Sequence, residues 1–273
     1  MFNVKVILRL VVPPIFIKIV NYWRRSKYGW HGNYKNWQEV KDASTGYDDI
    51  KIANLVKDSL LKVKKGEVAY ERDSVLFDEI EYSWPLLAGL MYASAKFQGS
   101  LSVVDFGGSL GSSYYQNKKF LDRLDSVLWN IIEQEHFVKI GKELFEHDNL
   151  RFFRDIESCK LKTMHNVLLL SSVIQYIEQP YSLIDKLLTY SFRFIIIDRT
   201  PFSLSQQDEI KVQVVPPSIY KASYPCWFLS EIKLNKLLSN HGYVLVESFI
   251  SEEGYIKDAV FKGAIWEKIC ENT

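Results

Sequence analysis

The stretch LSVVDFGGSLGSS, residues 101–113, decides the fold that this sequence predicts. Its apolar run ends at Asp105, the glycine-rich turn 107–111 follows, and Ser112 or Ser113 stands where a helix cap is expected. Glycines let a ligand approach the backbone closely, and the free amides of a helix start favour polar or anionic groups. The stretch therefore predicts a strand, a tight turn and a helix that hold a nucleotide-type cofactor, with a purely structural turn as the alternative.

Composition indicates a globular chain without a dominant charge. Of 273 residues, 47% are hydrophobic and 14% aromatic, which allows a sizeable core and argues against global disorder. The 34 basic and 33 acidic residues give a net charge of +1, so there is no general electrostatic case for nucleic acid. Cys159, Cys226 and Cys270 lie far apart without CxxC spacing, so we expect a cytoplasmic protein without a metal site.

Residues 1–27 form an apolar and basic N-terminal arm. Three charged residues interrupt its apolar run and Pro13-Pro14 would break a helix in the middle, so it is a poor membrane span. No small-residue cleavage site of a signal peptide follows. Its aromatic and basic cluster suits a membrane interface, so peripheral contact at the inner face of the membrane and packing against the domain are alternative interpretations.

Hydrophobic periodicity predicts alternating helices and strands. Helices are expected at 47–65, 85–97, 114–124, 136–145, 180–188 and 229–240, and strands at 101–105, 126–133, 150–154, 167–173, 192–197, 243–249 and 258–266. Only about eight residues separate the last two strands, too few for a parallel crossover, so this pair should be antiparallel. We expect a helical, aromatic-rich cap at 28–98 and a Rossmann-like domain at 99–273, with a lid insertion at about 201–228.

Polar residues follow several of the expected strands. Glu133 ends the second strand, where a doubly wound sheet meets the ribose hydroxyls of a cofactor. Asp155 follows the third strand and is a candidate for the adenine edge, while Ser171 follows the fourth. The cluster Glu71-Arg72-Asp73 precedes the sheet and is either a cover for the ligand site or a set of solvated or internally paired charges.

The whole set of motifs resembles a family of bacterial S-adenosylmethionine-dependent methyltransferases, from about Tyr28 to the C-terminus. The resemblance rests on AYERDSVLFD, YSWPLL, VVDFGGSLGSSYYQN, WNIIEQE, LLLSSVIQYIEQPY, IIIDRTPF and IYKASYP. It implies a class I methyltransferase fold, a seven-stranded and mostly parallel sheet whose last strand is antiparallel, with S-adenosylmethionine as cofactor.

The resemblance also assigns the cofactor loop to Asp105, Gly107, Gly108, Ser109 and Gly111, with Glu133 on the ribose. The usual loop reads D-x-G-x-G-x-G. Here Ser109 replaces the middle glycine, and Gly108 lies one position earlier. A serine adds a side chain where the methionyl part of the cofactor approaches.

The implied reaction is methyl transfer to an oxygen, nitrogen or carbon of a small molecule or glycan, with a role in cell-surface polysaccharide synthesis as one interpretation. Asp198 is the candidate base or substrate orienter, and Arg199 would hold an anionic group or pair with Asp198. The acceptor pocket is expected to include Tyr176, Gln175, Tyr220 and Tyr224. A structural hydrogen-bond cluster is the alternative interpretation of this set.

Two other functions stay open from the sequence. One is a catalytically inactive, methyltransferase-like binding or assembly protein, which the Ser109 departure allows. The other is a nicotinamide-dependent sugar-modifying enzyme, which the glycine loop and Glu133 would also suit. That enzyme needs a Tyr-x-x-x-Lys pair beside the fourth or fifth strand, and Tyr176 is followed four residues later by Pro180.

Overall fold

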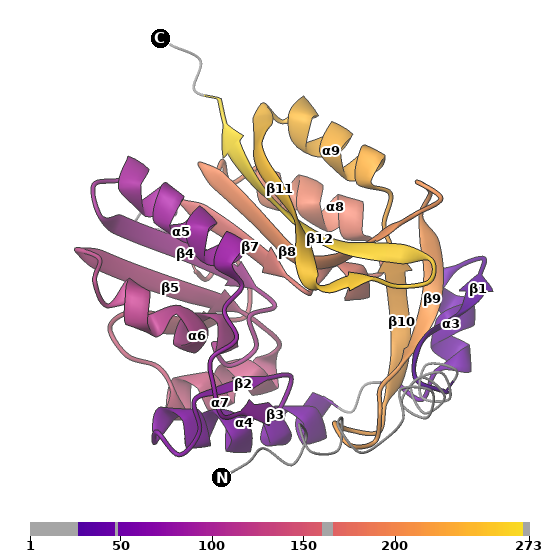
Figure 1. The fold of residues 1–273 in the computed structure, drawn as a ribbon, viewed down its shortest axis with the longest axis horizontal. Helices are drawn as coiled ribbons and strands as arrows, with labels where there is room; N and C mark the ends of the chain where they lie inside the picture. The colour runs from indigo at the N-terminus through magenta and orange to yellow at the C-terminus, as the bar shows by residue number, and fades with distance from the viewer. Residues whose placement is uncertain (1–26, 47–48, 160–165, 270–273) are drawn as a thin grey trace, which may run out of the picture. The chain divides into compact units, whose positions relative to one another are not determined.

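The computed structural model describes residues 27–46, 49–159 and 166–269 (Figure 1). The described chain forms two compact units. The first contains residues 27–46 and 210–226, and the second contains the remainder. The expected cap at 28–98 thus contributes residues to both units. All but the last residue of the N-terminal arm lies outside the described residues.

The second unit is built on a seven-stranded sheet in the order β11-β12-β8-β7-β4-β5-β6. Its strands are β4 (Ser100–Phe106), β5 (Ser126–Ile132), β6 (Leu150–Phe153), β7 (Val167–Ser171), β8 (Phe194–Ser203), β11 (Tyr243–Tyr255) and β12 (Ala259–Lys268). Neighbours from β6 to β8 pair in parallel, whereas β12 is antiparallel to both β8 and β11. This arrangement is the class I methyltransferase fold, which confirms the predicted fold and the reversed last strand.

Helices cover both faces of this sheet. They are α4 (Asp49–Lys64), α5 (Trp84–Lys96), α6 (Ser112–Leu121), α7 (Glu135–Leu144), α8 (Pro180–Leu188) and α9 (Glu231–Asn240). Apolar side chains of α8 and α9 pack with alternate residues of β7 and β8 in one buried cluster. On the opposite face, Gly89 of α5 leaves room for Ile196 and Ile265, and Tyr114 of α6 contacts Trp129. Burial of such side chains stabilises each layer by about 1.5–3 kcal/mol per large residue.

Parallel pairing brings the ends of the central strands to one edge. Asp105 of β4 lies beside Ile131 of β5, and Ser171 of β7 lies beside Asp198 of β8. Open α/β sheets bind ligands at the carboxyl ends of their strands. The polar residues singled out in the sequence at 105, 171 and 198 therefore share the edge where a ligand is expected.

A short hairpin precedes α5 in the second unit. It pairs β2 (Tyr70–Arg72) with β3 (Val75–Phe77) through a two-residue turn. Both turn residues, Asp73 and Ser74, have left-handed φ angles, 51° and 66°, as tight hairpin turns require. The cluster Glu71-Arg72-Asp73 thus lies on a strand and its turn.

The first unit contains strands that the sequence analysis did not predict. Its sheet has the order β1-β9-β10, formed by β1 (Gly29–Tyr34), β9 (Glu209–Val214) and β10 (Ser223–Phe228), with helix α3 (Trp37–Ala43) after β1. Gly29 pairs with Val214 in the antiparallel register of β1 and β9. The segment expected to be a lid therefore holds two strands, although it lacks a clean alternation of apolar residues.

Within the part of the chain that the structure describes, no helix combines the length and hydropathy needed to cross a bilayer.

Candidate cofactor and acceptor site

The loop between β4 and α6 has a repeating left-handed backbone. Gly107, Ser109 and Gly111 have φ angles of 72°, 53° and 102°. These are the three positions at which the D-x-G-x-G-x-G pattern places glycine. Ser109 therefore keeps the glycine-like conformation of the loop, at a steric cost on the order of 1–2 kcal/mol.

Gly108 is needed for space and not for its φ angle. A Cβ built at this position would overlap the carboxylate of Asp105. That carboxylate is 1% exposed and accepts a hydrogen bond of 3.0 Å from Trp129 Nε1. Burial, with Glu133 nearby, raises the pKa of Asp105 to about 7. The Asp105 carboxylate thus packs directly against Gly108 of the loop. Its contact with a cofactor stays a prediction.

Glu133 lies at the carboxyl end of β5, next to the glycine loop. The Gly107 amide donates to Ile132 O at 2.9 Å, which ties the loop to the end of this strand. The Glu133 amide in turn donates to Phe153 O at 3.0 Å, and its side chain accepts from the Gln134 amide at 2.7 Å. Glu133 is thus half-buried beside the glycine loop, and its contact with a ribose stays a prediction.

Three predicted residues lie at the end of β7 and on the short turn that follows it. Ser171 is half-buried at the strand end, and Tyr176 is half-buried in the 3-10 turn η1 (Ile174–Tyr176). Gln175 is fully buried, and its Nε2 donates to Ser172 Oγ and to Arg199 O, both at 3.2 Å. Among the residues that the structure describes, its Oε1 has no hydrogen-bond partner. Gln175 therefore links the ends of β7 and β8.

Asp198 and Arg199 form a bulge in β8. Lys262 pairs with Thr200 and Ala264 with Ile197, so two residues of β8 oppose Gly263 alone. Arg199 has a left-handed φ angle of 53°. Asp198 Oδ1 accepts from the Arg199 amide at 2.9 Å and from Ser251 Oγ at 3.0 Å. Burial raises the pKa of Asp198, which is 1% exposed.

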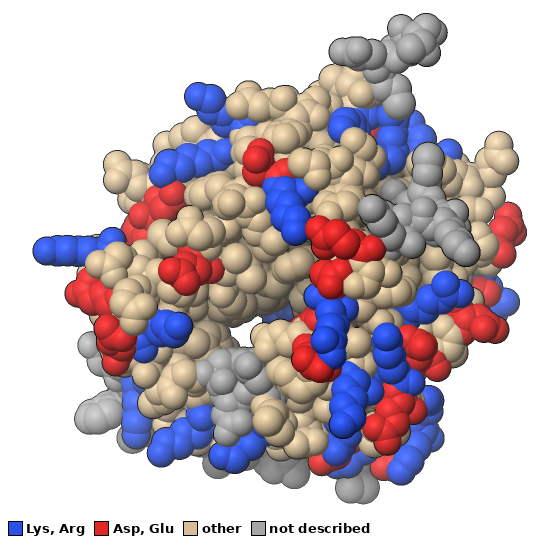
Figure 2. Space-filling model, turned by 180° about the vertical axis from the view of Figure 1, so that it is seen from behind, with Lys and Arg blue, Asp and Glu red and all other residues tan. Residues whose placement is uncertain are grey.

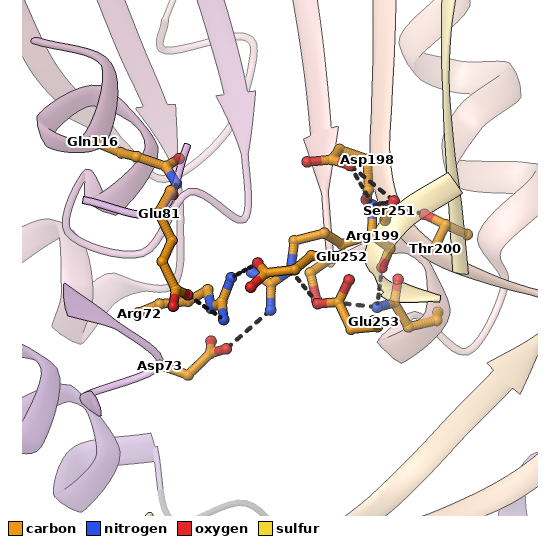
Figure 3. A network of polar contacts seen from close by, with 12 residues as sticks. Arg72, Asp73, Glu81, Gln116, Asp198, Arg199, Thr200, Ser251, Glu252 and Glu253 are labelled. Atoms are coloured by element: carbon orange, nitrogen blue, oxygen red, sulfur yellow. Dashed lines mark hydrogen bonds and ion pairs between the residues drawn. The ribbon is translucent and has the colours of Figure 1, made fainter. Parts of the chain in front are cut away.

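The Arg199 guanidinium does not bind the Asp198 carboxylate. Its Nε donates to Glu253 Oε1 at 2.6 Å, and its Nη2 donates to Asp73 Oδ2 at 3.2 Å (Figure 3). The two acids raise the pKa of Arg199 against the effect of burial. Asp73 belongs to the turn of the β2–β3 hairpin and Glu253 belongs to β11. Arg199 therefore joins these two elements.

A second arginine joins the same two elements. Arg72 Nη1 donates to Glu252 Oε2 at 2.5 Å, and Nη2 contacts Glu81 Oε2 at 3.5 Å (Figure 3). We call Arg72, Asp73, Arg199, Glu252 and Glu253 the hairpin clasp. Arg72 and Asp73 of the Glu71-Arg72-Asp73 cluster are thus paired internally, one of the alternatives that the sequence left open, whereas Glu71 is buried and takes no part in these ion pairs. The clasp also fastens the hairpin to the bulge of β8.

None of the contacts described above involves the remaining predicted residues. Asp155 is exposed, and its Oδ1 accepts from the hydroxyl of Ser158 and, at 2.6 Å, from the Ser158 amide, which together lower its pKa. Tyr220 and Tyr224 belong to the first unit, where their hydroxyls lie 3.3 Å apart. Their expected contact with an acceptor stays a prediction.

Sequence reasoning missed Ser251, Glu252 and Glu253. The strand 243–249 was expected to end before them, whereas β11 continues to Tyr255. The signal was present as two acids and a serine directly after an apolar run, the same pattern that singled out Asp198.

Acidic and basic side chains are interspersed over the described part of the face in Figure 2. A surface that binds nucleic acid usually gathers its basic residues on one face or stripe. The near-equal numbers of acidic and basic residues in the sequence are therefore matched by a mixed distribution of charge on this face.

Comparisons with known proteins give likeness at the level of structure alone. No family model and no curated protein matches the sequence. Among solved structures, the chain is similar to magnesium protoporphyrin IX methyltransferase from Synechocystis with bound SAH, at 14% identity and a TM-score of 0.45, over 68% of this chain and 83% of that one.

Two further solved structures are similar. The N-terminal domain of EvdMO1, determined with SAH and D-fucose, has 13% identity and a TM-score of 0.49, over 82% of this chain and 98% of that one. An S-adenosylmethionine-dependent methyltransferase from Clostridium acetobutylicum has 8% identity and a TM-score of 0.46, over 69% and 92%. At these identities the likeness concerns the fold, which the strand order defines independently.

Proposed function

We propose that this chain is an S-adenosylmethionine-dependent methyltransferase that acts on a small-molecule acceptor. The observation that carries the proposal is the pairing of the glycine loop with Glu133. Both follow adjacent parallel strands, and a backbone hydrogen bond joins Gly107 to the end of β5. A carboxylate there can accept from two ribose hydroxyls of a nucleoside cofactor.

The loop glycines permit close packing of the loop against the protein, because a Cβ at Gly108 would overlap the Asp105 carboxylate and one at Gly107 would overlap Val173. S-adenosylmethionine would supply an electrophilic methyl group in this place. The loop, Glu133, and Ser171 at the end of β7 would bind and orient it, and Asp155 remains the candidate for its adenine edge.

The residues of this chain would then position the methyl donor and the acceptor and remove a proton from the acceptor. Alignment of donor and acceptor accounts for much of the rate in such a direct transfer. Asp198 is the proposed base, because burial raises its affinity for a proton and two donors fix its Oδ1. Tyr176 and Gln175, on the turn after β7, are the proposed contacts of the acceptor from this unit.

The finer part of the proposal concerns the acceptor. Tyr176 is aromatic, and aromatic rings suit the faces of sugars, so a glycan is the acceptor we favour among small molecules. Such a substrate would fit a role in polysaccharide synthesis. Methyl transfer to purified nucleotide sugars or lipid-linked glycans would support this choice, and absence of transfer to both would count against it.

The proposal is tested by replacing the ribose-binding acid. Glu133→Gln should weaken binding of S-adenosylhomocysteine about 10-fold or more, because a hydrogen bond to a charged group is lost. Glu135→Gln is the matched control, since Glu135 lies two residues away and pairs with the exposed Arg154. Calorimetric titration of both variants gives the affinities. Equal affinity for the Glu133→Gln variant and the unaltered protein would contradict the assignment.

A further inference from the structure

The β2–β3 hairpin places a carboxylate against the first turn of α6. Ser112 is the first residue of this helix, and its Oγ donates to Glu71 Oε1. The amide of Ser74 donates to Glu71 Oε2 at 3.1 Å. Glu71 has no exposed surface. A second contact, from Gln116 Nε2 to Glu81 O, holds the following segment to the same helix.

Helix α6 lacks a cap of its own. Gly111 occupies its N-cap position with no side-chain hydrogen bond, and the first turn contains no acid. The first amides of a helix have no intrahelical acceptors and carry a partial positive charge, which favours an anion. Glu71 therefore provides, from another element, the negative group that this helix end lacks.

The same helix end has a defined use in dinucleotide-binding folds. There, the glycine loop leads to a helix whose N-terminus receives the pyrophosphate of the cofactor. In this chain the corresponding end already faces a buried carboxylate. Burial, with a smaller effect of the nearby Asp73 carboxylate, raises the pKa of Glu71 to about 7. A phosphate group at this place would meet a carboxylate instead of free amides.

We infer that Glu71 is a specificity-determining residue that excludes phosphate-bearing nucleotides from the glycine loop and so reserves the loop for a nucleoside cofactor without phosphates. This inference rests on the proposed function and deepens it. The selectivity comes from a hairpin outside the Rossmann-like sheet, through the contact of Glu71 with Ser112.

The test is a gain of binding, which misfolding does not mimic. ADP is titrated by calorimetry at pH 8, where Glu71 is mostly ionised, into the unaltered protein, Glu71→Ala and Glu71→Gln. We expect ADP to bind Glu71→Ala at least 10-fold more tightly than the unaltered protein. Glu71→Gln, which keeps the shape and removes the charge, should show a smaller gain and serves if Glu71→Ala does not fold.

The matched control is Glu67→Ala, which removes the same charge from an exposed residue before the hairpin. It should leave ADP binding unchanged. Equal ADP affinity in both Glu71 variants and the unaltered protein would overturn the inference, as would an equal gain in Glu67→Ala. S-adenosylhomocysteine, titrated into the unaltered protein, tests the proposed function separately, because the ADP comparison does not depend on its outcome.

Discussion

Ser109 takes a backbone conformation that glycine adopts without steric cost. Its φ angle of 53° matches the left-handed values of Gly107 and Gly111 on either side. The sequence shows the departure from the glycine pattern, but it does not show that the backbone keeps the shape of that pattern. Neighbouring residues, and not the intrinsic preference of serine, hold the loop in place.

Ser109→Gly should therefore stabilise the protein by about 0.5–1 kcal/mol, because it removes the steric cost of a side chain in the left-handed region. Urea unfolding measures the change, and S-adenosylhomocysteine affinity should be kept or improved. Ser109→Ala is the control, since alanine keeps the Cβ and should give no gain. A loss of stability in Ser109→Gly would show that the serine side chain itself holds the loop.

Asp105 makes stability depend on pH. Its pKa rises from 3.8 to about 7 on folding, so the folded state binds its proton more tightly than the unfolded state. The stabilising contribution is complete below the unfolded pKa and is lost as pH rises through 7. The free energy of unfolding, measured in urea, should therefore decline between about pH 4 and pH 7, by an amount on the order of 2–4 kcal/mol for this group.

The variant Asp105→Asn should lack this part of the decline and keep an acceptor for Trp129 Nε1. Asp155→Asn is the control, because the pKa of Asp155 is lowered and its contribution is lost on acidification instead. Identical pH profiles for Asp105→Asn and the unaltered protein would contradict the burial argument.

At the scale of elements, the central strands and their helices were predictable because each has a clear period and a recognisable end. The hairpin β2–β3 was not, because its strands contain three residues each and a run of charged residues in the sequence resembles a solvated surface. Its position depends on partners 180 residues away, such as Glu252 for Arg72. Such long-range ion pairs have no signal in a local window of sequence.

The ion pairs of the hairpin clasp should stabilise the hairpin, and this stabilisation should decrease as the salt concentration rises. Exposed and half-exposed ion pairs contribute up to about 1 kcal/mol each, and salt screens them. Glu252→Gln removes the acid partner of Arg72 and should speed amide hydrogen exchange of residues 70–77 by about two- to fivefold. Raised salt should speed exchange in the unaltered protein more than in the variant.

Glu135→Gln breaks an exposed ion pair elsewhere in the same unit and is the control for this experiment. Exchange of residues 70–77 should not change in it. If Glu252→Gln leaves the hairpin amides as protected as before, the ion pair does not hold the hairpin.

At the scale of the whole molecule, the sequence predicted the sheet and its reversed last strand from the short connection between β11 and β12. It did not predict that segments 27–46 and 210–226 form a unit of their own. The strands of that unit have mixed burial and no simple alternation, so their pairing depends on contacts across the chain. The candidate site was predictable where polar residues end strands, as at Glu133 and Asp198, and not where distant loops supply partners.

The strand order and the pairing of the glycine loop with Glu133 support a cofactor of the S-adenosylmethionine type. Calorimetric titration of the unaltered protein with S-adenosylhomocysteine and with NAD tests this claim most directly. We predict binding of S-adenosylhomocysteine in the micromolar range and no heat of binding with NAD. If the protein binds NAD and does not bind S-adenosylhomocysteine, the result would favour a nicotinamide enzyme. If it binds neither ligand, the result would contradict a cofactor-binding role for the loop.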